Sequence, residues 1–157
     1  MGTAGTLPDV FSAGDLKVAI VASRYNDNIV AALIEGARAA WRRRGGSDSA
    51  LRLERVPGAF ELPLAARALA MSVKFDAVVA LGCVIRGETA HFDYIAAECA
   101  RGLQRVMLDT GVPISFGVLT VDTLAQALQR AAADSSNKGT EALETALAMA
   151  TLLRRLK

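Results

Sequence analysis

The stretch DAVVALGCVI, residues 76–85, decides the fold class. After its first residue it is almost continuously apolar, and valine is its commonest residue. Such a run is typical of a strand that is buried on both faces, as in a parallel sheet that helices cover on either side. We therefore expect a central parallel strand here, with a functional loop at its carboxyl end.

Strand patterns and helix patterns alternate along the rest of the chain. Short β-rich runs are separated by segments whose apolar residues recur at helical spacing. Strict alternation predicts a three-layer α/β/α sandwich on a central four-stranded parallel sheet, with right-handed crossovers. The other strands are expected at 16–23, 51–56 and 113–120, and the helices at 26–44, 61–71, 91–111, 122–134 and 137–156, with Asn26 or Asp27 capping the first helix.

The composition is that of one ordinary domain with a buried core. The chain has 157 residues, of which 52% are hydrophobic and 22% are charged, and its net charge is +2. This charge is too small to indicate nucleic-acid binding, and no stretch is long and apolar enough to span a membrane. We expect a single domain over 1–157, in which residues 1–15 form a flexible or extended N-terminal arm and not a signal peptide.

The numbers of cysteine and histidine residues indicate whether a metal site and which cellular compartment are expected. Two cysteines, one histidine and the lack of a CxxC pair argue against a zinc site. Two cysteines make no disulfide framework either, so a reducing cytoplasm is the expected location. We therefore expect no metal site.

Aromatic and polar side chains follow the carboxyl ends of the predicted strands. Tyr25 follows the first strand, Phe60 and Glu61 follow the second, and His91 comes after the third. Each has a structural alternative: the aromatic residues as core, Glu61 as a helix-start carboxylate, and His91 as a first-turn residue. Because carboxyl ends of parallel strands meet at one edge, their coincidence favours a ligand site there.

The segment GCVIRGET, residues 82–89, has the spacing of a nucleotide phosphate loop, with Glu88 in place of the lysine. A carboxylate at that place repels a triphosphate, which excludes a nucleotide hydrolase. Backbone N–H groups at the following helix start still suit a single phosphate, with Arg130 as its charged partner. The residues thus predict a phosphate-bearing small substrate, a flat ring stacked on an aromatic side chain, and histidine acid–base chemistry.

Five stretches together resemble the 6,7-dimethyl-8-ribityllumazine synthase family, which catalyses the penultimate step of riboflavin synthesis. The resemblance covers nearly the whole chain after residue 15 and implies a flavodoxin-like fold. It also implies a reaction without metal or cofactor, in which 5-amino-6-(D-ribitylamino)uracil condenses with 3,4-dihydroxy-2-butanone 4-phosphate and releases phosphate and water. The stretches are VASRYNDNIV, VPGAFELPLAA, DAVVALGCVIRGETAHFDY, PISFGVLTVDTLAQALQRA and NKGTEAL.

The resemblance also implies a role for each candidate residue. His91 matches the proton donor of the family, and Tyr25 the aromatic residue that stacks on the pyrimidine. Phe116 closes the pyrimidine site from a neighbouring subunit. The implied pyrimidine and ribityl contacts are Tyr25, Ala59, Phe60, Glu61, Cys83, Val84, Ile85 and Phe116, and the implied butanone phosphate contacts are Glu88, Thr89, Arg130 and Lys138.

The family assembles as pentamers with active sites between adjacent subunits. Many members stack twelve pentamers into an icosahedral shell of sixty subunits. The chain has no insertion between its last two helices, which favours the shell over a lone pentamer. Association with riboflavin synthase is a further expectation from the family.

Two departures from the family pattern leave alternatives open. Cys83 stands where threonine is common, with little expected effect because the contact is through backbone. Residues 132–136 lack the usual glycines, threonine and lysine and include Asp134, a change expected to weaken phosphate binding or alter helix packing. A flavin-binding or sensing module that has lost catalysis, and a container whose main function is the shell, are therefore the alternatives to a working synthase.

Overall fold

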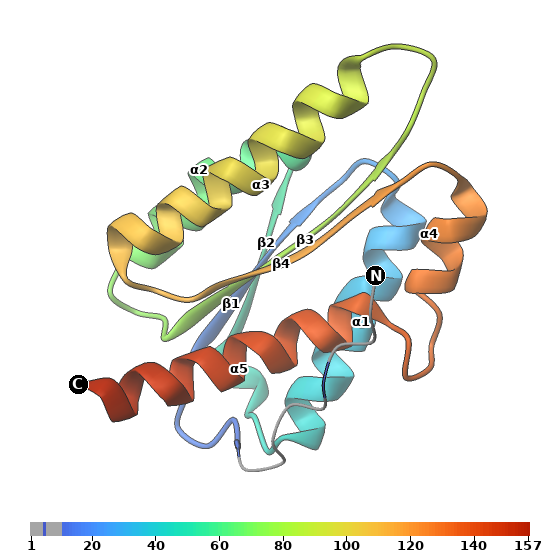
Figure 1. The fold of residues 1–157 in the computed structure, drawn as a ribbon. Coiled ribbons are helices and arrows are strands. Elements are labelled where there is room, and N and C mark those ends of the chain that lie inside the picture. The colour runs from blue at the N-terminus through green and yellow to red at the C-terminus, as the bar shows by residue number, and fades with distance from the viewer. Residues whose placement is uncertain (1–4, 6–10) are drawn as a thin grey trace.

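A computed structural model describes residue 5 and residues 11–157, and Figure 1 shows its ribbon. Its centre is a four-stranded parallel sheet in the order β2-β1-β3-β4. This confirms the predicted α/β class with a central parallel sheet. The strands are β1 (Val18–Ser23), β2 (Leu51–Val56), β3 (Ala77–Ile85) and β4 (Ile114–Val121).

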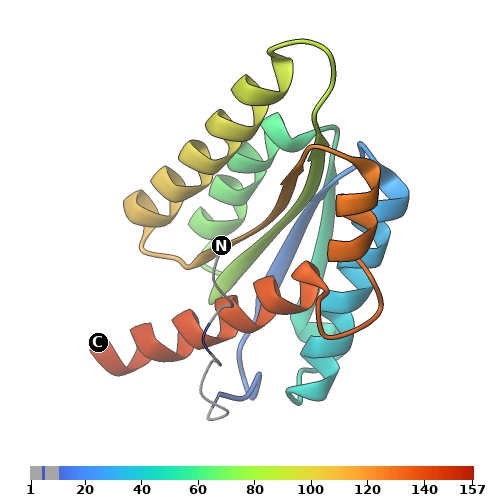
Figure 2. The same cartoon turned by 45° about the vertical axis from the view of Figure 1, so that its right-hand side comes forward.

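Helices cover both faces of this sheet, as the alternating pattern predicted. The pair α2 and α3 lies on one face, and α1, α4 and α5 lie on the other (Figures 1 and 2). A short 3₁₀ turn, η2, leads into α2. The bounds are α1 (Asp27–Arg43), η2 (Ala59–Glu61), α2 (Leu62–Met71), α3 (His91–Thr110), α4 (Leu124–Arg130) and α5 (Lys138–Leu156).

The two central strands are buried on both faces, which explains the apolar run from which the fold was predicted. Every residue of β1 is buried, and so are residues 77–83 of β3. Along β1, Ile20 packs into the core beneath α1 and α5, whereas Val21 packs into the core beneath α2 and α3. Full burial of such a side chain stabilises the fold by roughly 1.5–3 kcal/mol.

The strand register brings the four carboxyl ends to one edge of the sheet. At this edge Ser23 pairs with Val56, and Ile85 pairs with Val121. The segments that follow these strands therefore start from neighbouring positions. Loops and helix starts that carry the candidate residues gather at this carboxyl edge, where parallel sheets bind ligands.

The predicted helix 122–134 ends early, because α4 stops at Arg130. The side chain of Asn137, which is 3% exposed, donates from Nδ2 to the carbonyls of Ala131 (3.1 Å) and Ala132 (3.0 Å). The chain leaves helical geometry at Ala131, which has φ −110° and ψ 7°. These hydrogen bonds hold residues 131 and 132 in the turn after α4, so the prediction of helix as far as 134 is wrong.

The segment that departs from the family pattern forms a closed turn. Asn137 caps α5, since its Oδ1 accepts from the N–H groups of Gly139 (2.9 Å) and Thr140 (3.2 Å). The Asp134 carboxylate accepts from the Ser136 N–H at 2.7 Å and from the Ser136 hydroxyl. These hydrogen bonds from Ser136 lower the pKa of Asp134. Asp134 is therefore engaged within its own turn.

The predicted N-terminal arm lies partly outside the described residues, since positions 1–4 and 6–10 are not among them. Phe11 and Ala13 are buried in the core beneath α1 and α5. The Ala13 N–H donates to the Arg44 carbonyl at 2.9 Å, and the Arg44 guanidinium lies 4.5 Å from the centroid of the Phe11 ring. The part that enters the domain thus packs against the end of α1.

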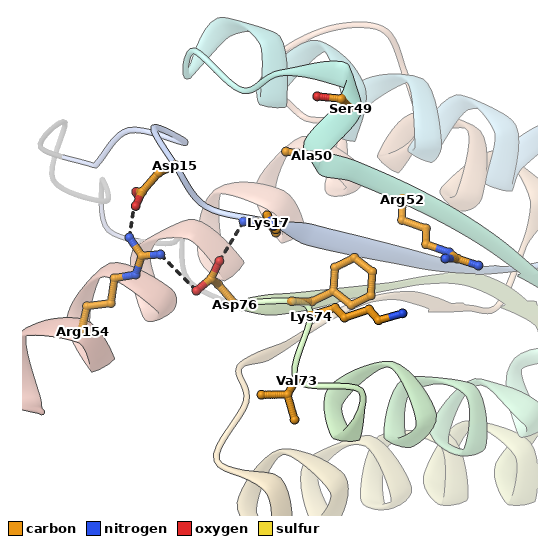
Figure 3. A pocket seen from close by; sticks show the side chains of 10 residues that line it. Asp15, Lys17, Ser49, Ala50, Arg52, Val73, Lys74, Asp76 and Arg154 are labelled. Atoms are coloured by element: carbon orange, nitrogen blue, oxygen red, sulfur yellow. Dashed lines mark hydrogen bonds and ion pairs between the residues drawn. The ribbon is translucent and has the colours of Figure 1, made fainter.

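The amino edge of the sheet carries a depression of about 660 Å³ whose charged side chains are largely paired (Figure 3). Arg154 of α5 contacts Asp15 at 2.8 Å and Asp76 at 3.1 Å. The second oxygen of Asp76 accepts from the Lys17 N–H at 2.8 Å. Arg154 thereby joins the segment before β1, the loop before β3 and the C-terminal helix.

Candidate active site

A cavity of about 540 Å³ opens at the carboxyl edge of the sheet. It lies between the end of β1, the turn after β2, the end of β3 and the start of α3. Such a position suits ligand binding in a parallel α/β sheet. Its lining consists of Tyr25, Asn26, Gly58, Ala59, Phe60, Glu61, Cys83, Val84, Ile85, His91 and Ile95.

The structure brings most of the predicted site residues together in this cavity, which we call the carboxyl-edge pocket. They comprise His91 and every residue predicted for the pyrimidine and the ribityl chain except Phe116. Phe116 lies instead beside α3, in a separate depression with Arg101 and Met107. The remaining predicted residues lie away from the lining: Glu88, Thr89, Arg130 and Lys138.

Tyr25 and Phe60 present their rings to solvent at the mouth of the pocket. Their exposed fractions are 73% and 59%, so the alternative that they are core residues is wrong. Large aromatic faces left in water are costly unless a ligand or a partner covers them. The two side chains therefore offer a flat apolar surface for a planar ring.

Glu61 is held in place by the turn that carries it. Its Oε2 accepts from the Gly58 N–H at 2.8 Å, a contact that closes η2 at the entrance to α2. The expected helix-start role is thus present together with the position in the pocket. The other oxygen of the carboxylate makes no hydrogen bond within the described residues, and carboxylates are acceptors suited to hydroxyl groups.

His91 is the first residue of α3 and is exposed at the pocket. Its backbone N–H faces the Thr89 hydroxyl at 3.4 Å. The imidazole shares the pocket lining with the end of β3, from Cys83 to Ile85. An accessible imidazole beside a ligand cavity can serve as a general acid or base toward a bound molecule.

The Cys83 thiol is buried, whereas its backbone carbonyl makes a contact beside the pocket. Burial raises the pKa of the Cys83 thiol to about 11, so the reactive thiolate is scarce at neutral pH. The Cys83 carbonyl accepts a hydrogen bond of 2.9 Å from Asn26 Nδ2. Burial likewise raises the pKa of Cys99 to about 12, and that residue lies in the core beneath α2 and α3.

Asn26 is a pocket residue that the sequence analysis did not assign to the site. It lies in the left-handed region, with φ 55° and ψ 50°, where asparagine is one of the few tolerated residues. It occupies the N-cap position of α1, yet its side chain makes no capping hydrogen bond and reaches Cys83 instead. The predicted side-chain cap is therefore wrong. Its position directly after Tyr25 in the sequence is the signal that could have assigned it to the site.

The cations predicted for phosphate lie on the last two helices and have partners of their own. Arg130 ends α4 and donates from Nη1 to the Gln126 carbonyl at 3.1 Å. Lys138 opens α5 and forms an ion pair with Glu141. Arg130 is exposed and the Lys138 side chain is 42% exposed. An ion pair as open to water as that of Lys138 is weak enough to exchange for a better anion.

Two features are absent from the part of the chain that the structure describes. No group of three or more histidine, cysteine, aspartate or glutamate side chains there is arranged to hold a metal ion. No helix among residues 11–157 is long and apolar enough to cross a membrane.

The fold and the pocket define an α/β protein with a ligand site at the carboxyl edge of a parallel sheet. The site combines a flat aromatic surface, a fixed carboxylate and an accessible imidazole. The chain belongs to the 6,7-dimethyl-8-ribityllumazine synthase family, which matches residues 15–154. This confirms the resemblance carried by the five sequence stretches.

Curated relatives with the name 6,7-dimethyl-8-ribityllumazine synthase match almost the whole chain. The protein of Edwardsiella ictaluri is 52% identical over 153 residues, which cover 97% of this chain and 98% of that one. The protein of Syntrophus aciditrophicus is 50% identical, with 92% and 94% covered. That of Chlorobium phaeovibrioides is 49% identical, with 93% and 94% covered.

Proposed function

We propose that this chain is a 6,7-dimethyl-8-ribityllumazine synthase. It condenses 5-amino-6-(D-ribitylamino)uracil with 3,4-dihydroxy-2-butanone 4-phosphate, and the products are 6,7-dimethyl-8-ribityllumazine, phosphate and water. The observation that carries the proposal is that relatives of this name match almost the whole chain at about 50% sequence identity. The chemistry of the carboxyl-edge pocket supports it, because the pocket suits a flat ring with a hydroxylated side chain.

The pyrimidine and its ribityl chain occupy the carboxyl-edge pocket in this proposal. The pyrimidine stacks on Tyr25, and the ribityl chain runs along Ala59 and Phe60. Glu61 accepts from a ribityl hydroxyl with the oxygen that does not hold the Gly58 N–H. The backbone of residues 83–85 meets the uracil edge. A carboxylate already fixed by its own turn loses little entropy when the ligand binds.

The butanone phosphate binds at the start of α3, where helix N–H groups favour an anion. Glu88 supplies backbone N–H, Thr89 supplies N–H and hydroxyl, and Arg130 and Lys138 supply positive charge. In the reaction the uracil's own amine forms an imine with the ketone and releases water, phosphate is eliminated, and the ring closes with loss of a second water. His91 is the proton donor in this sequence, and positioning of the two substrates supplies much of the acceleration.

A homopentamer completes the site, because Phe116 lies outside the pocket of its own chain and is assigned to that of a neighbour. Phe116 is 47% exposed, and Leu124 and Leu128 of α4 are also exposed, which leaves apolar surface for association. Twelve pentamers form an icosahedral shell in this proposal, in the cytoplasm and in association with riboflavin synthase. The single domain over 1–157 and its N-terminal arm belong to the same proposal.

A flavin-binding or sensing module is the second candidate, and the altered segment 132–136 favours it. The closed turn around Asp134 and Asn137 supports a folded segment there, which is compatible with a working phosphate site. Lumazine formation from both substrates, followed by absorbance, separates the two candidates. Turnover supports the synthase, and tight riboflavin binding without turnover supports the sensing module.

A further inference from the structure

Arg86 joins three segments at the carboxyl edge of the sheet, directly after β3. Its backbone N–H donates to the Val121 carbonyl at 2.9 Å, which ties it to the end of β4. Its Nε donates to Asp122 Oδ1 at 2.9 Å. Its Nη1 donates to the two oxygens of Asp93 at 3.0 and 3.3 Å, and its guanidinium lies 4.2 Å from the Phe92 ring centroid.

The contacts on α3 fall on the two residues that follow His91. Phe92 is buried beneath the guanidinium, and Asp93 lies in the first helical turn, where a carboxylate is favoured by the helix dipole. The loop before His91 offers little packing of its own, since residues 87–90 are exposed. The position of the first turn of α3 relative to β3 therefore depends largely on Phe92 and on Arg86.

We propose that Arg86 is a positioning residue that fixes the first turn of α3 so that His91 faces the carboxyl-edge pocket. This rests on the proposed synthase function, in which His91 donates a proton to the bound substrate. Arg86 itself lies outside the pocket lining and acts through the helix start.

A purely stabilising role accounts poorly for this arrangement. The side chains of Arg86, Asp93 and Asp122 are 43%, 59% and 67% exposed, and ion pairs so open to water contribute little to folding. The guanidinium instead fixes the relative positions of its partners, because its planar group contacts two carboxylates and one aromatic ring at the same time. A lysine ammonium keeps the charge but cannot hold all three partners.

The link continues toward the helix that carries Arg130. The Asp122 N–H donates to Gln126 Oε1 at 2.8 Å, and the Gln126 carbonyl accepts from Arg130 Nη1 at 3.1 Å. Asp122→Asn weakens this side of the network and leaves the Asp93 side intact. We therefore expect Asp93→Asn to resemble Arg86→Lys more closely than Asp122→Asn does.

The test is a double-mutant cycle between Arg86→Lys and His91→Ala, with turnover of both substrates as the readout. We expect Arg86→Lys to lower kcat by about three- to tenfold through misplacement of the imidazole, with the KM for the pyrimidine unchanged. In the His91→Ala background the same change should have almost no effect on kcat, because the group it positions is gone. Arg105→Lys, an exposed ion-pair arginine of the same helix, is the matched control and should leave kcat unchanged.

Two results would overturn the proposal while wild-type turnover still upholds the synthase function. One is an unchanged kcat in Arg86→Lys, and the other is an equal loss of kcat with and without His91. Amide hydrogen exchange of residues 93–97, whose N–H groups donate to the carbonyls at the start of α3, gives a readout that needs no activity. Faster exchange in Arg86→Lys at an unchanged melting temperature supports the proposal, and unchanged exchange contradicts it even if the wild-type chain makes no lumazine.

Discussion

The two ends of the sheet carry depressions of similar size and opposite chemistry. At the amino edge, in a depression of about 660 Å³, Arg154 pairs with Asp15 and Asp76 (Figure 3). Arg52, which also lines this depression, pairs with Glu54. At the carboxyl edge, within about 540 Å³, the lining residues form no ion pair with any other described residue, and two aromatic rings face water.

The difference separates a structural junction from a ligand site. Charges that satisfy one another need no outside partner, so the amino edge holds chain segments together. The two exposed rings, the Glu61 oxygen without a hydrogen bond and the accessible His91 imidazole instead suit contact with a bound ligand. Changes at the carboxyl edge should therefore alter substrate constants, and changes at the amino edge should alter stability alone.

The largest effect is expected from Tyr25→Ala at the carboxyl edge. Stacking of a base on an aromatic side chain contributes about 1–3 kcal/mol, so the KM for the pyrimidine should rise roughly 5- to 150-fold. The melting temperature should stay close to that of the wild type, because the ring is exposed. Tyr25→Phe keeps the ring and is the control. A pyrimidine KM unaffected by Tyr25→Ala would contradict the stacking role.

Arg130→Ala should raise the KM for the butanone phosphate by roughly tenfold, since a charged hydrogen bond contributes about 1.5–3 kcal/mol. The KM for the pyrimidine should not change, because Arg130 lies outside the pocket lining. Steady-state kinetics with each substrate titrated in turn measures the two KM values separately. Equal effects on both constants would show that Arg130 supports the fold and not the phosphate.

At the amino edge, Val73→Gly should stabilise the protein without altering catalysis. Val73 has φ 59° and is 91% exposed, so it bears left-handed strain with little packing in return. Relief of about 1–2 kcal/mol of strain, less about 0.5–1 kcal/mol for glycine's greater entropy, leaves a small net gain. Val73→Ala retains the strain and should give none. Denaturant unfolding measures both variants, and a less stable Val73→Gly would refute this account.

The smallest effect is expected from the pH dependence of the Asp15–Arg154 pair. Hydrogen bonds from Arg154 hold the pKa of Asp15 below its ordinary value of 3.8. The pair therefore stabilises the fold fully above that value, and its contribution is lost as the pH falls through the lower folded pKa. Asp15→Asn should flatten the decline of the melting temperature in this acidic range. Identical pH curves for the two proteins would show that the pair contributes nothing measurable.

The sequence predicted the sheet well because its evidence is local and periodic. The apolar run at 76–85 and the alternation of elements suffice for a parallel sheet, and the sheet then places Tyr25, Phe60 and His91 at one edge. Burial of the central strands follows from those patterns without knowledge of any long-range contact.

The failures have tertiary causes that no local pattern contains. Alanines at 131–133 favour helix, yet α4 ends at Arg130, and the carbonyls of Ala131 and Ala132 accept from the buried Asn137 amide in the turn that follows. Asn26 has the residue type of a helix cap, but the Cys83 carbonyl on a neighbouring strand is its partner.

The rate of lumazine formation by the wild-type chain tests directly whether this chain is a working synthase. Both substrates are supplied, the butanone phosphate is titrated, and the product is followed by absorbance. We expect turnover that saturates at ordinary substrate concentrations, which would show that the closed turn at 131–137 is compatible with catalysis. Pyrimidine binding without any lumazine would contradict it, because the ring site would then survive in a chain that has lost the phosphate half of the reaction.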